Sequence, residues 1–105
     1  MVWIAKHQHE IIAACRIMPL PDQSKLLTGV YVNAQFRQQG IASQLVTQAS
    51  ANQTKLFTFA LSHLSDFYQT LGFKIMDYND LPCELAQRFT AYVKQGRQIV
   101  AMIKQ

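Results

Sequence analysis

The chain has 105 residues, which is enough for one compact domain and too few for two. Half of its residues are apolar and 15% are charged, a composition that indicates a globular protein and excludes a disordered one. The net charge of +4 comes from scattered basic residues, which argues against a nucleic-acid-binding arm and suits a small anionic ligand. We therefore expect a single domain over residues 1–105.

Two further features bear on where the protein works. No stretch reaches the roughly 18 uncharged apolar residues of a membrane helix, and the start at residues 1–6 does not resemble a signal peptide. The cysteines, Cys15 and Cys83, show neither metal-binding nor redox spacing. We interpret both as reduced thiols and expect a cytoplasmic protein.

The first third of the chain predicts three strands. Residues 1–6 and 11–20 are rich in Ile, Val, Ala and Trp, and the polar segment 7–10 predicts the turn of a hairpin between them. A loop follows at residues 19–24, where two prolines interrupt the pattern. Residues 26–32 are apolar on both faces, which predicts a third strand in the middle of the sheet.

Helices and strands alternate in the rest of the chain. An apolar stripe of helical period runs from Ile41 to Ala49, and residues 56–61 predict a short buried strand. Ser65 suits the N-cap of a second helix, and Gly72 suits the left-handed residue after its end.

The last third predicts one more helix between two extended segments. Residues 73–78 extend, Pro82 and Glu84 suit the first turn of a helix that ends near Gly96, and residues 99–103 predict a final strand. The order β-β-β-α-β-α-β-α-β predicts an α/β domain with a central mixed sheet flanked by helices. Four phenylalanines are expected in its core: Phe57, Phe59, Phe67 and Phe73.

The junction between the third strand and the first helix carries most of the expected chemistry. A helix that begins where a strand ends presents unpaired N–H groups and the positive end of its dipole. Gly40 lets the backbone approach an anion without a Cβ in the way, and the small residues Ala42 and Ser43 keep the first turn open. Arg37 adds a charged fork that matches phosphate oxygens. Together these features predict a site for a pyrophosphate group.

The same segment, Arg-Gln-Gln-Gly-Ile-Ala at residues 37–42, resembles the coenzyme A-binding motif of the GNAT superfamily of N-acetyltransferases. That motif is an Arg/Gln-x-x-Gly-x-Gly/Ala loop after a central strand. Residues 67–73 resemble a second motif of the family, a helix ending in Tyr-x-x-Leu-Gly-Phe, and the two motifs occur at the family's usual separation. The resemblance covers essentially the whole chain from the first hairpin onward and implies a single GNAT-like domain that binds acetyl-coenzyme A.

The resemblance also implies roles for particular residues. Backbone groups of Val30 and Val32 would bind the pantetheine arm, in a gap where strands 26–32 and 56–61 separate. Tyr68 would lie beside the thioester sulfur and protonate the departing thiolate. Main-chain amides beside the Arg37 side chain would hold the pyrophosphate, and they belong to Gln38, Gln39, Gly40, Ile41, Ala42 and Ser43.

Two departures from the family pattern concern the acceptor site. Family members usually begin with a strand and two helices ahead of the first hairpin, and those helices help to wall the acceptor site. We therefore expect an acceptor site that is open or completed by a partner, and exposed apolar surface that favours a homodimer. Many members also carry a Glu on the strand that here spans residues 26–32, and this strand holds no acid. The base that deprotonates the acceptor amine is therefore unassigned.

Several other residues allow both a functional and a structural interpretation. His7, His9 and Glu10 could hold a metal ion, but a solvated turn is the commoner explanation, so no metal site is predicted. His63 could act as a general base or be an exposed loop histidine. Cys83, near a helix start, could be a reactive thiol or simply pack.

The sequence thus predicts an N-acetyltransferase that moves an acetyl group from acetyl-coenzyme A to a primary amine by direct attack in a ternary complex. The acceptor would be a small molecule or a peptide, and neither nucleic acid nor a membrane is an expected partner. An alternative stays open, a non-catalytic acyl-coenzyme A sensor that acts on a protein partner. Gly40 and Tyr68 also have structural readings, as a helix-start glycine and as a half-buried aromatic.

Overall fold

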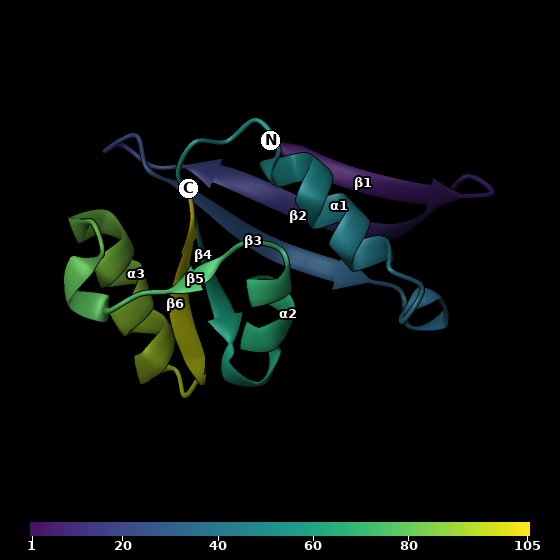
Figure 1. Cartoon of the computed structure of the whole chain (residues 1–105). Helices are drawn as coiled ribbons and strands as arrows, with labels where there is room; N and C mark the ends of the chain where they lie inside the picture. Colours follow the sequence, from purple (N-terminus) through teal and green to yellow (C-terminus); the bar gives the residue numbers. More distant parts are fainter.

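A computed structural model describes the whole chain, residues 1–105, as a six-stranded sheet with helices on both faces (Figure 1). The strands are β1 (Val2–His7), β2 (Glu10–Pro19), β3 (Lys25–Val32), β4 (Leu56–Leu61), β5 (Lys74–Ile75) and β6 (Ile99–Lys104). The α-helices are α1 (Ile41–Ser50), α2 (Ser65–Thr70) and α3 (Cys83–Lys94), with short 3-10 helices at Ala34–Phe36, Ser62–Leu64 and Tyr78–Asp80. The predicted order of elements is confirmed. None of the helices is long and apolar enough to cross a membrane.

The sheet is mixed, with strand order β1-β2-β3-β4-β6-β5. Every neighbouring pair is antiparallel except β3 and β4, which are parallel and are connected through α1. A parallel pair needs such a crossover, because the chain must return to the end of the sheet at which β3 began. The inner position predicted for β3 is confirmed. Because β3 and β4 are parallel, their carboxyl ends point in the same direction.

Successive side chains along each strand point to opposite faces of the sheet, so a hydrophobic core forms on each face. Leu27 and Leu56 pack on the face covered by α1 and α2, whereas the residues next to them, Leu26 and Phe57, pack with Leu85 of α3. The stripe predicted on α1 is buried on the first of these faces: Leu45, Val46 and Ala49. Of the four predicted core phenylalanines, Phe57 and Phe73 are buried, while Phe59 and Phe67 are partly exposed.

The outer face of β1 to β3, on the side away from α1, carries exposed apolar side chains. Ile4, Ala14 and Tyr31 lie in one row across the three strands. Four apolar residues of these strands are between 44% and 65% exposed: Val2, Ile4, Ile11 and Tyr31. Apolar side chains gathered in this way are typical of a contact surface.

The predicted N-cap of α2 is wrong. The chain enters α2 through the 3-10 helix Ser62–Leu64, so Leu64 takes the cap position without a side-chain hydrogen bond. Ser65 is therefore the first helical residue. The end of α2 agrees with the prediction, because Gly72 adopts a left-handed φ of 97°.

The extended segment predicted at residues 73–78 is shorter than expected. Only Lys74–Ile75 pairs as a strand, at the edge of the sheet against β6. Asp77 then accepts a hydrogen bond from the backbone N–H of Asn79 at 2.8 Å and turns the chain into a 3-10 helix.

Candidate active site

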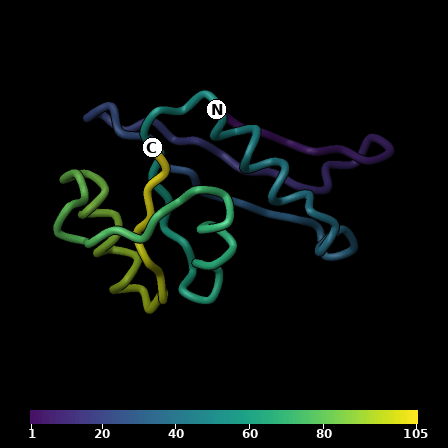
Figure 2. Tube along the Cα trace, in the orientation of Figure 1, coloured from purple at the N-terminus to yellow at the C-terminus, as the bar shows by residue number.

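The strands β3 and β4 pair only near their beginnings. The paired residues are Lys25 to Leu27 on β3 and Leu56 to Thr58 on β4, and the two strands then diverge, as the ribbon and the Cα trace both show (Figures 1 and 2). Where the pairing stops, the hydroxyl of Thr58 donates a hydrogen bond of 3.0 Å to the carbonyl of Leu27. The gap that the sequence predicted between these strands is confirmed.

A β-bulge in β3 accounts for the divergence. Two consecutive residues, Gly29 and Val30, oppose the single residue Cys15 of β2. Gly29 has a left-handed φ of 65°, a conformation that side-chain-bearing residues rarely adopt. A bulge bends its strand and increases the local twist, and this swings the end of β3 away from β4.

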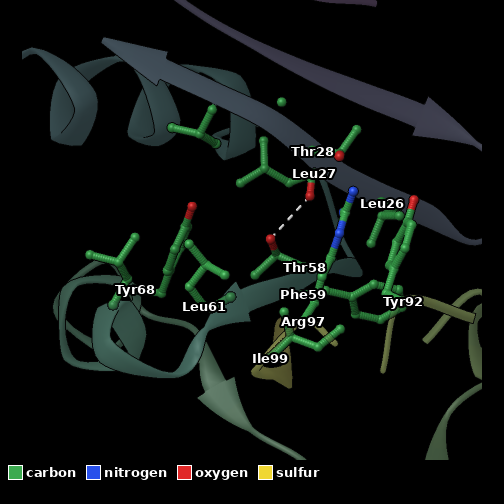
Figure 3. Close-up of a pocket in the computed structure, with 14 residues that line it drawn as sticks. Leu26, Leu27, Thr28, Thr58, Phe59, Leu61, Tyr68, Tyr92, Arg97 and Ile99 are labelled. Atoms are coloured by element: carbon green, nitrogen blue, oxygen red, sulfur yellow. Dashed lines mark hydrogen bonds between the residues drawn. The ribbon is translucent and has the colours of Figure 1, made fainter. Parts of the chain in front are cut away.

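The divergence leaves a cavity of about 450 Å³ between the two strands (Figure 3). Its walls are largely apolar and come from β3, β4, α2, the end of α3 and the start of β6. The lining contains no Asp, Glu or His. The polar side chains that line it are Thr28, Thr58, Tyr68, Tyr92 and Arg97.

Tyr68 lines the cavity from α2. The side chain is 6% exposed, and its ring packs edge-on against Phe67 and Phe73 with centroids 5.1 and 5.7 Å apart. Figure 3 shows the hydroxyl directed away from α2 toward β3. Burial raises the pKa of the Tyr68 phenol, and the nearby Cys15 thiol adds to this rise. The phenol is therefore protonated at neutral pH, the form that a general acid requires.

The first turn of α1 presents free backbone N–H groups. Gly40 is the N-cap, with a left-handed φ of 75° and no side-chain cap, and no atom lies within 4 Å of where its Cβ would be. The first helical hydrogen bond runs from Gln44 N–H to the Gly40 carbonyl at 3.1 Å, so the N–H groups of residues 41–43 have no acceptor in the protein. The amides of Gln38 and Gln39 are equally unpaired. Donors arranged in this way at a helix N-terminus are able to bind an anion.

Arg37 lies between the end of β3 and this helix start. Its Nε donates a hydrogen bond to the carbonyl of Val32 at 3.2 Å, which holds the side chain against the strand and leaves the outer guanidinium nitrogens free. Val30 lines the cavity, whereas Val32 does not. The predicted residues thus form two groups: the cradle at residues 37–43 follows the carboxyl end of β3, and the residues Val30 and Tyr68 line the cavity that runs along β3 at residues 26–30.

The remaining candidates from the sequence lie elsewhere. His63 is exposed and does not line the cavity, although its neighbour Leu64 does. Cys83 is the exposed first residue of α3, and the ring of His7 packs at a tilt against Phe36 with centroids 5.3 Å apart. No group of three His, Cys, Asp or Glu side chains is arranged to hold a metal ion.

Three residues at the site were not predicted from the sequence to belong to it. A lone glycine within a strand pattern often marks a bulge, so Gly29 carried a usable signal. Tyr92 and Arg97 lie at the end of α3, where Arg97 Cζ is 4.5 Å from the centre of the Tyr92 ring. Only the fold brings the end of α3 to the cavity between β3 and β4, so no local pattern could have revealed these two residues.

Comparison with known protein families agrees with this arrangement. Residues 1–75, which include the bulge, the cradle and Tyr68, match the family described as "Acetyltransferase (GNAT) domain". The chain belongs to this family. No match to the chain was found among curated protein sequences.

Solved structures resemble this GNAT domain in fold. N-acetylglutamate synthase from Neisseria gonorrhoeae, in complex with coenzyme A and N-acetyl-glutamate, has a TM-score of 0.79 at 15% identity. That match covers 96% of this chain and 24% of the synthase, so the chain spans about a quarter of the larger protein. Rv2747 from Mycobacterium tuberculosis, in complex with CoA and NLQ, has a TM-score of 0.74 at 15% identity, with 98% and 74% of the two chains covered. A GNAT family acetyltransferase from Elizabethkingia anophelis with acetyl-CoA bound has a TM-score of 0.71 at 19% identity, with 99% and 74% covered.

Proposed function

We propose that this GNAT domain is an N-acetyltransferase that uses acetyl-coenzyme A to acetylate a primary amine of a small molecule or a peptide. The observation that carries the proposal is the placement of two features, one beside β3 and one just beyond its carboxyl end. One is a cradle of unpaired amides at the start of α1, and the other is a cavity lined by the protonated phenol of Tyr68. The coenzyme A and acetyl-CoA complexes among the similar structures support the same cofactor.

The residues of the cradle fit the pyrophosphate of coenzyme A. The amides of residues 38–43 supply the donors, Gly40 leaves room for the anion, and the free guanidinium nitrogens of Arg37 add a positive charge. Main-chain groups of Val30 and Val32 would bind the pantetheine arm as it passes into the gap between β3 and β4. The thioester would then lie in the cavity near Tyr68.

The proposed reaction is a direct transfer between two bound reactants. The amine nitrogen attacks the thioester carbonyl carbon, a C–N bond forms, the C–S bond breaks, and the thiolate takes the proton of the Tyr68 phenol. No carboxylate or imidazole lines the cavity to act as a base. The acceptor therefore reacts as the free amine, and the proton that its nitrogen loses passes to water. The Tyr68 phenolate regains its proton from water.

A second candidate function is an acyl-coenzyme A sensor without catalytic activity. The observation that favours it is the same lack of a carboxylate or imidazole in the cavity. A sensor would bind acetyl-coenzyme A and leave it intact in the presence of amines, whereas an enzyme would consume it.

The test combines cofactor binding with product detection. Acetyl-coenzyme A should raise the melting temperature of the protein, because it binds the native state only. Mass spectrometry should then detect an acetylated product when the protein is incubated with a panel of primary amines. Binding without any product would favour the sensor, and a melting temperature that acetyl-coenzyme A does not change would contradict both functions.

The assembly and the compartment are parts of the same proposal. The exposed apolar face of β1 to β3 would form the contact of a homodimer, with Ile4 and Tyr31 at its centre. Both cysteines are free thiols, which fits a reducing cytoplasm.

A further inference from the structure

Arg97 is the only charged residue that lines the cavity, and nothing in the proposed reaction uses it. No acidic side chain lines the cavity with it, so its charge has no counterion there. Arg97 is exposed to solvent where it lines the cavity, and its positive charge beside these largely apolar walls favours an anion. The cavity therefore attracts a negatively charged group of a ligand, and no group that lines it would pair with a positively charged one.

The backbone around Arg97 is fixed by the way in which α3 ends. Arg97 N–H donates to the Tyr92 carbonyl at 3.2 Å, and Gly96 N–H donates to the Val93 carbonyl at 2.9 Å. With Gly96 at a left-handed φ of 88°, these two hydrogen bonds form a Schellman motif. The motif folds Arg97 back over the last turn of α3, which places its guanidinium 4.5 Å from the centre of the Tyr92 ring.

The cation–π contact leaves the guanidinium able to bind a ligand. Arg97 Cζ lies over the Tyr92 ring, 4.5 Å from its centre, and a guanidinium carries five N–H donors that such a contact does not use up. Tyr92 itself is held edge-on against Phe59 of β4, with centroids 6.0 Å apart. The guanidinium thus rests on an aromatic ring that is itself packed against β4.

Arg97 and Tyr68 stand at different sides of the cavity. Tyr68 belongs to the core on the α1 and α2 face of the sheet, whereas Tyr92 packs on Phe59, which belongs to the α3 face. Figure 3 shows the two side chains apart, with Leu61 and Thr58 of β4 between them. A molecule that enters from the α3 side would pass Arg97 before it reaches Tyr68.

We propose that Arg97 binds a carboxylate of the acceptor, so that the preferred acceptor is a small amine that also carries a carboxylate, as an amino acid does. The inference rests on the proposed transferase function and specifies its substrate class. The planar edge of the guanidinium matches the two oxygens of a carboxylate, and the acceptor amine would extend from there toward Tyr68. Polyamines are disfavoured, because no acid in the cavity would receive their second positive charge.

The test measures binding first, so that it does not depend on turnover. N-acetylglycine, N-acetylglycinamide and N-acetylaminomethylphosphonate are titrated into the protein saturated with coenzyme A, and calorimetry gives each Kd. The wild type should bind the carboxylate about tenfold more tightly than the amide, which is the effect of one partly exposed charge-assisted hydrogen-bonded pair. Arg97→Gln should remove this preference, and Arg97→Lys should retain part of it. The control Lys94→Gln removes an exposed cation of α3 outside the cavity and should retain the whole preference.

The outcomes separate this inference from the proposed function. A carboxylate preference that depends on Arg97 supports the inference even if the protein acetylates nothing, in which case the transferase function has failed. Equal Kd values for carboxylate and amide, or tighter binding of the phosphonate than of the carboxylate, would overturn the inference. So would a wild type that acetylates glycine and glycinamide with equal kcat/KM, although the transferase function would then stand.

Discussion

Replacing Tyr68 by Phe separates catalysis from packing at the proposed site. The substitution removes one oxygen and keeps the ring that packs against Phe67 and Phe73 at 5.1 and 5.7 Å. The hydroxyl makes no hydrogen bond to a protein group, so its removal leaves no partner unsatisfied. We therefore expect the free energy of unfolding to change by less than about 1 kcal/mol. The Kd for coenzyme A should stay the same, because the phenol acts only on the departing thiolate.

The expected kinetic effect is large in comparison. Losing a general acid lowers kcat by roughly 10²-fold or more, which corresponds to about 2.7 kcal/mol of transition-state stabilisation. The assay is steady-state acetylation of an acceptor found in the amine panel, with chemical denaturation as the measure of stability. Tyr78→Phe is the matched control, since it removes a phenol oxygen that bonds Thr90 outside the cavity. Full activity of the Tyr68→Phe enzyme would refute the role assigned to Tyr68.

Three further predictions follow from the geometry. Because burial raises the pKa of the Tyr68 phenol, kcat should not fall between about pH 7 and pH 9.5. The ratio kcat/KM should rise with pH up to the pKa of the acceptor amine. A fall in kcat near neutral pH would contradict this prediction. Gly29→Val should reduce the free energy of unfolding by about 1–2 kcal/mol, because valine resists the left-handed φ of 65°, while Gly29→Asn loses less; urea denaturation of the two variants should show the difference. Analytical ultracentrifugation should find a dimer that Tyr31→Glu dissociates, and a wild-type monomer at tens of micromolar would exclude the dimer.

Much of the fold was predictable, because the elements carry local signals. The bounds of β4 agree with the predicted strand 56–61, and α1 begins at the predicted residue, Ile41. The apolar period of α1 and the mostly apolar run of β4, interrupted only by Thr58, both follow from what the sheet buries. The left-handed residue at the start of α1 was predictable for a similar reason, since Gly40 is the one glycine between β3 and α1.

The interior of the site was less predictable, because it depends on contacts between distant segments. The glycine at position 29 signals a bulge in β3, but the two residues of β2 between which the pairing shifts depend on a contact with a distant strand. The cation–π contact of Arg97 is local to the end of α3, but its place in the cavity depends on the divergence of β4 from β3. The wrong N-cap at Ser65 has a local cause, because the 3-10 helix before it already begins to turn the chain.

The measurement that tests the central claim most directly is calorimetric titration of acetyl-coenzyme A into Gly40→Asp and Gly40→Asn. The two side chains have nearly the same shape, both adopt the left-handed conformation more readily than most residues, and they differ by one negative charge. Nothing lies within 4 Å of the Cβ position, so the first side-chain atom of either variant has room. If the amides beside Gly40 hold the pyrophosphate, Gly40→Asp should bind at least about tenfold more weakly than Gly40→Asn, because its carboxylate repels the phosphates. Equal affinities for the two variants would place the cofactor elsewhere and contradict the account.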